Sequence, residues 1–225
     1  MSTLTNLDLI RRVPLFSMIT PDQVLLLSDA VDKRRFKRGE RIVTQGGQAN
    51  ALFILLTGSA RVVFTDDKNR EVILAALVPG DYIGEMSLID NDPHSASVET
   101  ERQTDVLVLG RAEFMRCLSG NPLMAYSVMR GLVARLRKAD EKIGSLALMG
   151  VHDRVANVLL DSAVLDGAQR LVIREKISRQ DIAKMVGASR EMVSRVMRDL
   201  EVQGFIQTRD DGAVVINERC AVKRS

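Results

Sequence analysis

The stretch from Ser178 to Leu200 constrains this chain more than any other, because it predicts two short helices joined by a tight turn. Ser178 lies three residues before Asp181, which is the spacing of a capping box, and Ser189 can cap the second helix. Gly187 can adopt the left-handed conformation that ends a helix and turns the chain. Apolar residues recur at helical spacing on one face of each helix, at Ile182, Ala183, Val186, Val193, Val196, Met197 and Leu200. We therefore expect the two helices to pack against each other.

The outer face of the second helix carries side chains that are able to read DNA bases. They are Arg190, Glu191, Ser194, Arg195 and Arg198. An arginine presents a fork of donors that fits the O6 and N7 acceptors of guanine, and a glutamate accepts from the amino group of cytosine. In a helix-turn-helix, the N-terminal part of the second helix enters the major groove. Glu191 and Arg195 would alternatively form a surface ion pair worth about 0.3–0.5 kcal/mol, but the capped first helix and the glycine turn favour DNA readout.

The sequence of these helices resembles a known family. Ser189-Arg-Glu-Met-Val-Ser-Arg-Val196, preceded by Ser178-Arg-Gln-Asp-Ile-Ala183 and followed by Leu200-Glu-Val-Gln-Gly-Phe-Ile206, is similar to the DNA-binding domain of the CRP/FNR (catabolite activator) regulators. The resemblance extends over nearly the whole chain. It implies a homodimer that binds double-stranded DNA at a palindromic TGTGA-like site and has RNA polymerase as a partner.

The resemblance also implies roles for individual residues. Arg190, Glu191 and Arg195 would read base edges in the half-site. Contacts to the phosphate backbone would come from Ser178, Arg179, Gln180 and Ser189. The family often has a threonine where this chain has Met192, so one backbone contact of the family is missing from the pattern.

The first half of the chain has a different, strand-rich pattern. From Phe36 to about Arg111, apolar and β-branched runs at 51–56, 60–64, 72–78 and 104–109 are separated by glycines at positions 39, 46, 47, 58, 80 and 84. Strands that recur at such short spacing indicate a sandwich or barrel of the jelly-roll type. The polar stretch 66–70 is typical of a hairpin tip.

These patterns predict an α+β chain in three segments. We expect an N-terminal jelly-roll β-barrel, resembling a cyclic-nucleotide-binding domain, at residues 1–120, a dimerisation helix at 121–149 and a winged helix-turn-helix at 150–225. The boundary between the last two falls near Met149 and Gly150. The wing is predicted as a hairpin in which 205–208 and 213–216 flank the turn 210–212. A length of 225 residues suits two domains.

One loop, Gly84 to Val98, resembles the phosphate-binding cassette of cyclic-nucleotide-binding domains. By that likeness Glu85 accepts from a ribose hydroxyl, Ser95 meets the phosphate, and amides near Gly84 and Met86 approach the sugar-phosphate as an anion-binding nest. The alternative is a loop that serves packing alone. His94 stands where the cAMP-binding pattern has an arginine, and a neutral imidazole does not replace a bidentate guanidinium.

The region after the barrel predicts a helix with an apolar seam. The seam residues alternate in steps of three and four: Met129, Leu132, Leu136, Ala139, Ile143 and Leu146. A helix packed only on its own barrel is the alternative, but the surrounding charges suit an exposed rim. We expect a parallel homodimer, which would place two recognition helices about one DNA turn, roughly 34 Å, apart.

The same helix bears on the effector. The resemblance makes it the roof of the ligand pocket, to which we assign Arg135 and Asp140. The cAMP-responsive members have a threonine-serine pair where this chain has Ala139 and Asp140. An ionised aspartate accepts hydrogen bonds and donates none, which suits the N1–H and exocyclic amine of guanine. This favours cyclic di-GMP or cGMP over cAMP, unless Asp140 is a solvated rim residue.

Composition limits the remaining classes. The two cysteines, Cys117 and Cys220, support neither a disulfide framework nor an iron-sulfur or zinc site. With His94 and His152 as its histidines, the chain lacks the metal ligands of a cupin enzyme, and we expect no catalytic activity. A haem bound through His94, or no small-molecule effector, stays an alternative. No signal peptide or long apolar run stands out, so we expect a cytoplasmic protein that does not enter a membrane.

Overall fold

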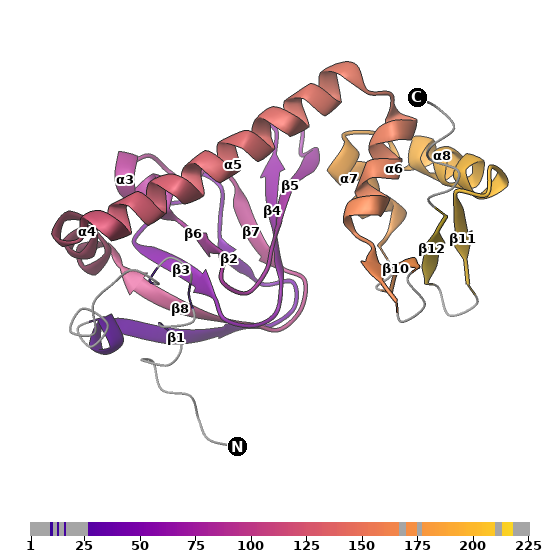
Figure 1. Ribbon diagram of the computed structural model, residues 1–225. Helices are drawn as coiled ribbons and strands as arrows, with labels where there is room; N and C mark the ends of the chain where they lie inside the picture. The colour runs from indigo at the N-terminus through magenta and orange to yellow at the C-terminus, as the bar shows by residue number, and fades with distance from the viewer. Residues whose placement is uncertain are drawn as a thin grey trace. The chain divides into compact units, whose positions relative to one another are not determined.

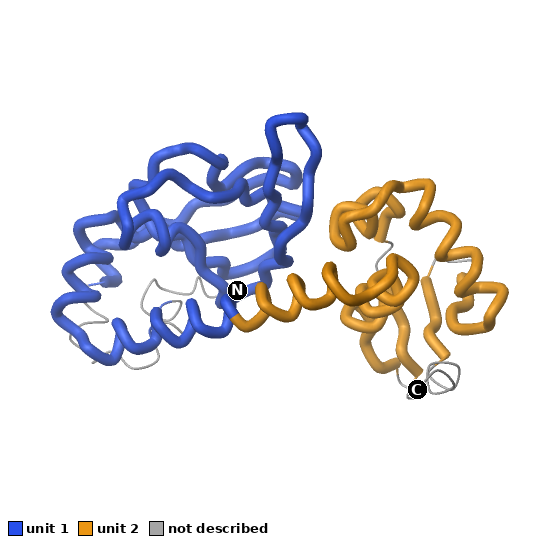
Figure 2. The backbone as a smooth tube through the Cα atoms, turned by 90° about the horizontal axis from the view of Figure 1, so that it is seen from above, with its two compact units in different colours: residues 1–136 blue, residues 137–225 orange. Residues whose placement is uncertain are grey.

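The computed structural model describes residues 27–166, 170–174, 177–209 and 213–217, together with Ile10, Val13 and Phe16. The chain forms two compact units, residues 1–136 and 137–225 (Figures 1 and 2). The long helix α5 (Pro122–Leu148) belongs to both, because the division falls within it. The predicted segmentation at 120 and 149 differs from this division and stays a prediction.

The first unit is a β-sandwich of two antiparallel sheets. In its described part, one sheet has the order β1-β8-β3-β6 and the other has the order β2-β7-β4-β5. The bounds of the strands are β1 (Val31–Phe36), β2 (Arg41–Val43), β3 (Ala51–Leu55), β4 (Ala60–Thr65), β5 (Glu71–Leu77), β6 (Tyr82–Ile83), β7 (Ser97–Thr100) and β8 (Thr104–Gly110). The predicted runs correspond to β3, β4, β5 and β8. The jelly-roll expectation is confirmed.

Strand β1 was not recognised in the sequence, for a physical reason. It is an edge strand, and its residues Asp32 to Arg35 are exposed and charged. Charged side chains are common on sheet edges, and they conceal the apolar alternation that marks a strand with one buried face. The short strands β2, β6 and β7 also lacked a long apolar run.

The hairpin tip between β4 and β5 is confirmed. The Asp66 amide donates to the Arg70 carbonyl at 3.0 Å, and the Asp66 carboxylate accepts from the amides of Lys68 and Arg70. Asn69 adopts the left-handed conformation with φ of 58°, which asparagine tolerates better than most residues.

Helices cover the outer face of the β1-β8-β3-β6 sheet (Figure 1). Alternate residues of β3 and β8 point outwards and pack with α4 (Arg111–Gly120) and the first half of α5, in a cluster that includes Leu52, Ile54, Leu107, Leu109, Phe114, Met124 and Val128. The intervening residues point between the two sheets, among them Ala51, Leu55, Val106 and Val108. This period of two is what a sheet buried on both faces requires. The short helix α3 (Glu85–Asp90) follows β6.

The second unit is a winged helix-turn-helix. After α5 ends at Leu148, α6 (Val151–Asp161) begins, so the helix break falls at the predicted Met149–Gly150. The remaining elements are β9 (Val164–Leu165), β10 (Leu171–Ile173), α7 (Arg179–Val186), α8 (Arg190–Val202), β11 (Ile206–Thr208) and β12 (Val214–Ile216). The strands form a sheet of order β11-β12-β10-β9. The predicted wing hairpin is confirmed, while its turn at 210–212 lies outside the described residues.

The helices of the described chain have no stretch long and apolar enough to cross a membrane. Instead, α5 and α6 have a buried face and an exposed one.

A buried carboxylate joins β1 to β8. Asp105 lies directly opposite Arg35 in the strand register. It accepts from Arg35 Nε at 2.7 Å and Nη2 at 3.1 Å, and Lys33 Nζ lies 3.4 Å from it. The hydrogen bonds from Arg35 hold the pKa of Asp105 below its ordinary value of 3.8. The charged edge strand is therefore anchored to the sheet by an ion pair as well as by its backbone.

Asp105→Asn should lower the free energy of unfolding by about 1–2 kcal/mol at pH 7, because charge-assisted hydrogen bonds are weakened while Arg35 stays largely in solvent. Folding lowers the pKa of Asp105, so its stabilising effect is present above about pH 4 and is lost as the pH falls through the lowered pKa. Urea unfolding at pH 7 and at about pH 2.5 should show a difference between the two proteins that narrows in acid. An equal difference at both pH values would contradict this assignment. Asp161→Asn, at an exposed position, is the control.

Candidate functional site

The helix pair of the second unit begins and ends where the sequence predicts. The Ser178 hydroxyl accepts from the Asp181 amide at 3.0 Å, and the Ser189 hydroxyl accepts from the Met192 amide at 3.2 Å. Gly187 ends α7 in the left-handed conformation, with φ of 64° and ψ of 46°. Both helix starts are thus satisfied by local side chains, as capping predicts.

The two helices bury the predicted apolar face. Ile182, Ala183 and Val186 of α7 and Val193, Val196, Met197 and Leu200 of α8 lie in one core cluster with α6 and the wing. The opposite face of α8 exposes Arg190, Glu191, Arg195 and Arg198. Ser194 is turned back, because its hydroxyl donates to the Arg190 carbonyl at 2.9 Å. These four exposed side chains are three guanidinium groups and one carboxylate.

The Glu191 carboxylate is held at the N-terminus of α8. Its own backbone amide and the Ser189 hydroxyl lower the pKa of Glu191, so the side chain is ionised at neutral pH and acts as an acceptor. Among the residues that the structure describes, no ion pair within 4 Å joins it to Arg195. The surface ion pair weighed in the sequence is not formed, and Arg195 keeps its donors for another partner.

The residues predicted to hold phosphates lie at the two helix starts. Ser178, Gln180 and Ser189 are exposed, and Arg179 is partly exposed. The hydroxyls of the two serines are engaged in their caps, so the donors that the described residues offer there are the remaining amides of the first turns, with Arg179 and Gln180.

In the first unit, the predicted cassette surrounds the short helix α3. Gly84 precedes it with φ of 96°, and a Cβ atom at this position would lie 2.7 Å from the Ala51 carbonyl oxygen. Only glycine fits this turn. Glu85 is buried, while Met86 and Ser95 are exposed.

Glu85 is paired with Arg135 of α5. Arg135 Nη1 donates to Glu85 Oε1, and Arg135 Nη2 donates to the carbonyl oxygen of Tyr82. The guanidinium also lies over the Tyr82 ring, 4.9 Å from its centroid. Burial raises the pKa of Glu85, and the Arg135 charge opposes this rise. The structure thus brings together two predicted ligand residues, Glu85 and Arg135, and adds Tyr82, for which the sequence carried no signal.

His94 occupies the end of the cassette loop. Its amide donates to the Gly47 carbonyl at 2.9 Å, and its carbonyl accepts from the Gly46 amide at 2.8 Å. The ring Nδ1 lies 3.4 Å from the Ser87 hydroxyl. Partial burial lowers the pKa of His94, so the imidazole is neutral at physiological pH. It supplies no positive charge at the place where the cAMP-binding pattern has an arginine.

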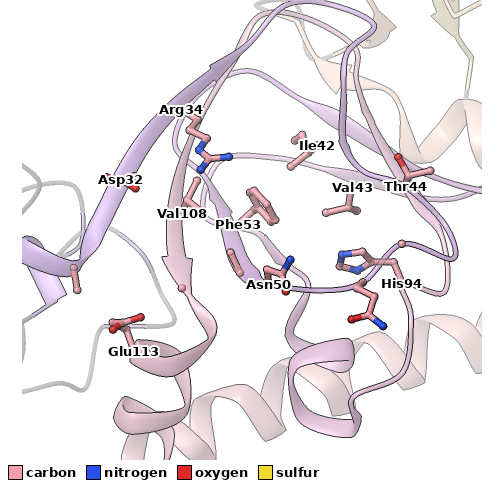
Figure 3. A pocket seen from close by; sticks show the side chains of 15 residues that line it. Asp32, Arg34, Ile42, Val43, Thr44, Asn50, Phe53, His94, Val108 and Glu113 are labelled. Atoms are coloured by element: carbon pink, nitrogen blue, oxygen red, sulfur yellow. The ribbon is translucent and has the colours of Figure 1, made fainter.

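A cavity of about 740 Å³ opens between β1 and β2. Its lining consists of Ala30, Asp32, Arg34, Ile42, Val43, Thr44, Gly47, Gln48, Asn50, Ala51, Phe53, His94, Val108, Gly110 and Glu113. Figure 3 shows Arg34 and His94 on opposite sides, with Phe53 between them. Among the described residues, Glu85, Ser95 and Arg135 do not line this cavity. It is therefore distinct from the Glu85–Arg135 pair, and His94 lies at its border with the cassette.

The exposed face of α5 follows a seam that is shifted from the predicted one. Leu132 packs against the barrel core, whereas Val133 is half exposed. The exposed apolar residues Tyr126, Met129, Val133, Leu136 and Ile143 still alternate in steps of three and four. Position 140 continues these steps, and Asp140 is exposed, as is Ala139. The predicted seam and the exposed seam share Met129, Leu136 and Ile143. They differ in that the predicted one includes Leu132, which packs on the barrel, and the exposed one includes Val133.

The predicted seam residue Leu146 is exposed at 47%. A Cβ atom on Gly187 would lie 3.6 Å from Leu146 Cδ2, so this end of α5 reaches the turn between α7 and α8 within the second unit.

No cluster of three or more metal-binding side chains occurs in the described ranges. Cys117 is a free, partly buried thiol, and Cys220 lies outside the described residues.

Two protein-family models match the chain. A cyclic nucleotide-binding domain matches residues 33–121, and a Crp-like helix-turn-helix domain matches residues 153–224. The first covers the barrel that holds the cassette, and the second covers the capped helix pair.

Several named proteins are similar over most of their length. The "cAMP-activated global transcriptional regulator Vfr" of Pseudomonas aeruginosa is 33% identical over 193 residues, which cover 83% of this chain and 90% of that protein. The "Cyclic AMP receptor protein" of Thermus thermophilus is 33% identical over 205 residues, covering 91% and 93%. A solved structure described as the c-di-GMP responsive global regulator CLP of Xanthomonas campestris has a TM-score of 0.77 at 26% identity, covering 88% of this chain and 99% of that one.

A cyclic-nucleotide-binding barrel followed by a Crp-like helix-turn-helix defines a DNA-binding transcriptional regulator. The chain belongs to the CRP/FNR family of these regulators.

Proposed function

We propose that this protein is a homodimeric, sequence-specific DNA-binding regulator whose affinity for DNA is set by a nucleotide bound at the cassette of its barrel. The observation that carries the proposal is the exposed face of α8, with Arg190, Glu191 and Arg195 opposite a fully buried apolar face. RNA polymerase is the proposed partner on DNA. The proposed functional parts are the sensor barrel at 1–120, the dimerisation helix at 121–149 and the DNA-binding domain at 150–225.

The proposed base contacts lie in the first two turns of α8. Arg190 and Arg195 are exposed arginines that fit guanine, and the ionised Glu191 fits the amino group of cytosine. Ser178, Arg179, Gln180 and Ser189 mark the two helix starts that would face phosphates. A TGTGA-like half-site offers guanines and, on the complementary strand, cytosines to this set.

Arg190→Ala should weaken binding to a TGTGA-like palindrome by about 1–3 kcal/mol and relax the preference at one base pair, because a bidentate guanine contact is lost. Arg198→Ala, on the same exposed face two turns later, is the matched control. It should reduce affinity for all sequences alike and lower the salt dependence. Gel-shift titrations against single-base variants of the palindrome measure both effects, and unchanged discrimination by the Arg190 variant would refute the assignment.

The proposed dimer forms through the exposed seam of α5. Five exposed apolar side chains lie on one helix face: Tyr126, Met129, Val133, Leu136 and Ile143. A seam with this spacing buries its side chains against a second copy of the same helix. Asp140 continues the seam as a polar position, which lowers the stability of such a helix pair but fixes its register.

Leu136→Glu should weaken the dimer by about 100-fold or more, because the variant places two carboxylates in an apolar seam. Leu136 is 62% exposed in the single chain, so the fold itself should tolerate the change. Sedimentation velocity measures the dimer, and affinity for a full palindrome should fall in parallel. Val78→Glu, at an exposed apolar position outside α5, is the control. An intact dimer in the Leu136 variant would exclude this face.

The proposed effector is a guanine nucleotide, with cyclic di-GMP preferred to cGMP and cAMP less favoured. In this proposal Glu85 accepts from a ribose hydroxyl, and Gly84, Met86 and Ser95 contact the phosphate. The neutral His94 offers less to a cyclic phosphate than an arginine would. Asp140 offers acceptors to the guanine edge. The Xanthomonas campestris neighbour is described as c-di-GMP responsive, whereas the named relatives from Pseudomonas and Thermus are cAMP regulators. Ligand would act by favouring one of two pre-existing arrangements of the protein.

Calorimetric titration with cyclic di-GMP, cGMP and cAMP should give the tightest binding with cyclic di-GMP. His94→Arg should raise affinity for cAMP by about tenfold or more, because a charge-assisted hydrogen bond to the cyclic phosphate is added. Micromolar binding of cAMP by the wild-type protein would overturn the guanine preference. Heat from none of the three would place the chain among regulators without such a ligand.

A further inference from the structure

Tyr82 and Gly131 form a tight contact between the barrel and α5. Tyr82 begins the short strand β6, and its side chain is 9% exposed. A Cβ atom built on Gly131 would lie 1.9 Å from the Tyr82 hydroxyl oxygen and 3.1 Å from Cζ. Glycine in the interior of a helix is unfavourable for the helix itself. This close approach explains why glycine stands at this position: any side chain would displace the tyrosine ring.

The same tyrosine meets α5 again one turn later. Arg135 lies four residues after Gly131, on the same helix face. Its guanidinium stacks on the Tyr82 ring, and its Nη2 donates to the Tyr82 carbonyl oxygen. The other terminal nitrogen, Nη1, donates to Glu85. The Tyr82 ring, the Tyr82 carbonyl oxygen and the Glu85 carboxylate together fix the position of the Arg135 guanidinium.

Two polar atoms in this region have no hydrogen-bond partner within the described part of the chain. They are the Tyr82 hydroxyl oxygen and Glu85 Oε2, both shielded from solvent. Glu85 is 1% exposed. A carboxylate buried this deeply needs a compensating cation to stay ionised, and Arg135 is the cation placed against it. The second oxygen remains available to a donor that enters the site.

We infer that Tyr82 is a positioning residue. Its ring packs closely against Gly131, where there is no side chain, and in this position it holds Arg135 against Glu85. The cassette carboxylate is thereby kept charged and oriented for a ligand hydroxyl. This inference rests on the proposed function for its ligand, but the Tyr82–Gly131 contact acts on Glu85 whether or not a nucleotide binds. If the ring is displaced, Arg135 loses its stacking contact and is held less closely against Glu85, and the pKa of the buried Glu85 rises further.

The test uses the full-length protein without ligand and a pH titration of the Glu85 carboxyl by ¹³C NMR. Gly131→Ala should raise the Glu85 midpoint by about one pH unit or more, because the new methyl group displaces the Tyr82 ring. Tyr82→Phe removes the clashing hydroxyl but keeps the ring and the carbonyl, and alone it should leave the midpoint unchanged. The double variant Tyr82→Phe/Gly131→Ala should restore the wild-type midpoint. Gly144→Ala is the control, because a Cβ atom there meets nothing within 4 Å.

An unchanged midpoint in Gly131→Ala, or a double variant that behaves like Gly131→Ala, would overturn the inference. A second arm measures cyclic di-GMP affinity at pH 6 and pH 8. Wild type should differ little between the two, whereas Gly131→Ala should bind more weakly at pH 6 than at pH 8, because a protonated Glu85 is a poorer acceptor. A shifted midpoint with unchanged affinity would show that the contact does not prepare a ligand site. Failure of the wild type to bind any of the three nucleotides overturns the proposed effector, while the NMR titration still decides the role of Tyr82.

Discussion

The burial of one carboxylate, Glu85, is the constraint on which the first unit depends. A charged group that is 1% exposed must be matched by a cation and by hydrogen bonds, and here the cation comes from α5 rather than from the barrel. The ion pair fixes the rotation of the helix about its own axis. Leu132 and Val128 then face the barrel core, and Met129, Val133 and Leu136 face away from it. The face that we propose for contact with a second copy is therefore a consequence of what the barrel side of the same helix must satisfy.

The second unit depends on local interactions instead. The two serine caps and the left-handed glycine fix where α7 and α8 begin and where α7 ends. Each of them makes its hydrogen bonds within a few residues of chain. The Ser189 hydroxyl accepts from the Met192 amide and also hydrogen-bonds to the Glu191 carboxylate, so the acceptor that we propose for a base is ordered at the start of α8 without DNA. Ordering a side chain in advance reduces the entropy lost on binding.

Prediction from sequence succeeded where the determining interactions are local, and failed where they join distant segments. The helix pair, the wing hairpin and the strands β3, β4, β5 and β8 each carry their own signal in caps, turns or apolar runs. Strand β1 does not, because its pairing with β8 rests on Arg35 and Asp105, seventy positions apart. The apolar pattern of α5 fits two seam phases equally well, and only contact with the barrel shows that Leu132 is used internally. The role of Tyr82 could not be predicted for the same reason, because its partners Gly131 and Arg135 lie in another element.

The close fit of Tyr82 against Gly131 also restricts how this chain can change over evolutionary time. The two positions are far apart in sequence, yet a methyl group at 131 and a hydroxyl at 82 compete for the same space. A lineage that first replaced the glycine would pass through an overpacked protein, and such overpacking is destabilising. A lineage that first lost the tyrosine hydroxyl would instead remove a buried oxygen without a partner in the described chain. The order of the two substitutions is therefore set by the packing: the hydroxyl must be lost before a methyl group is gained at position 131.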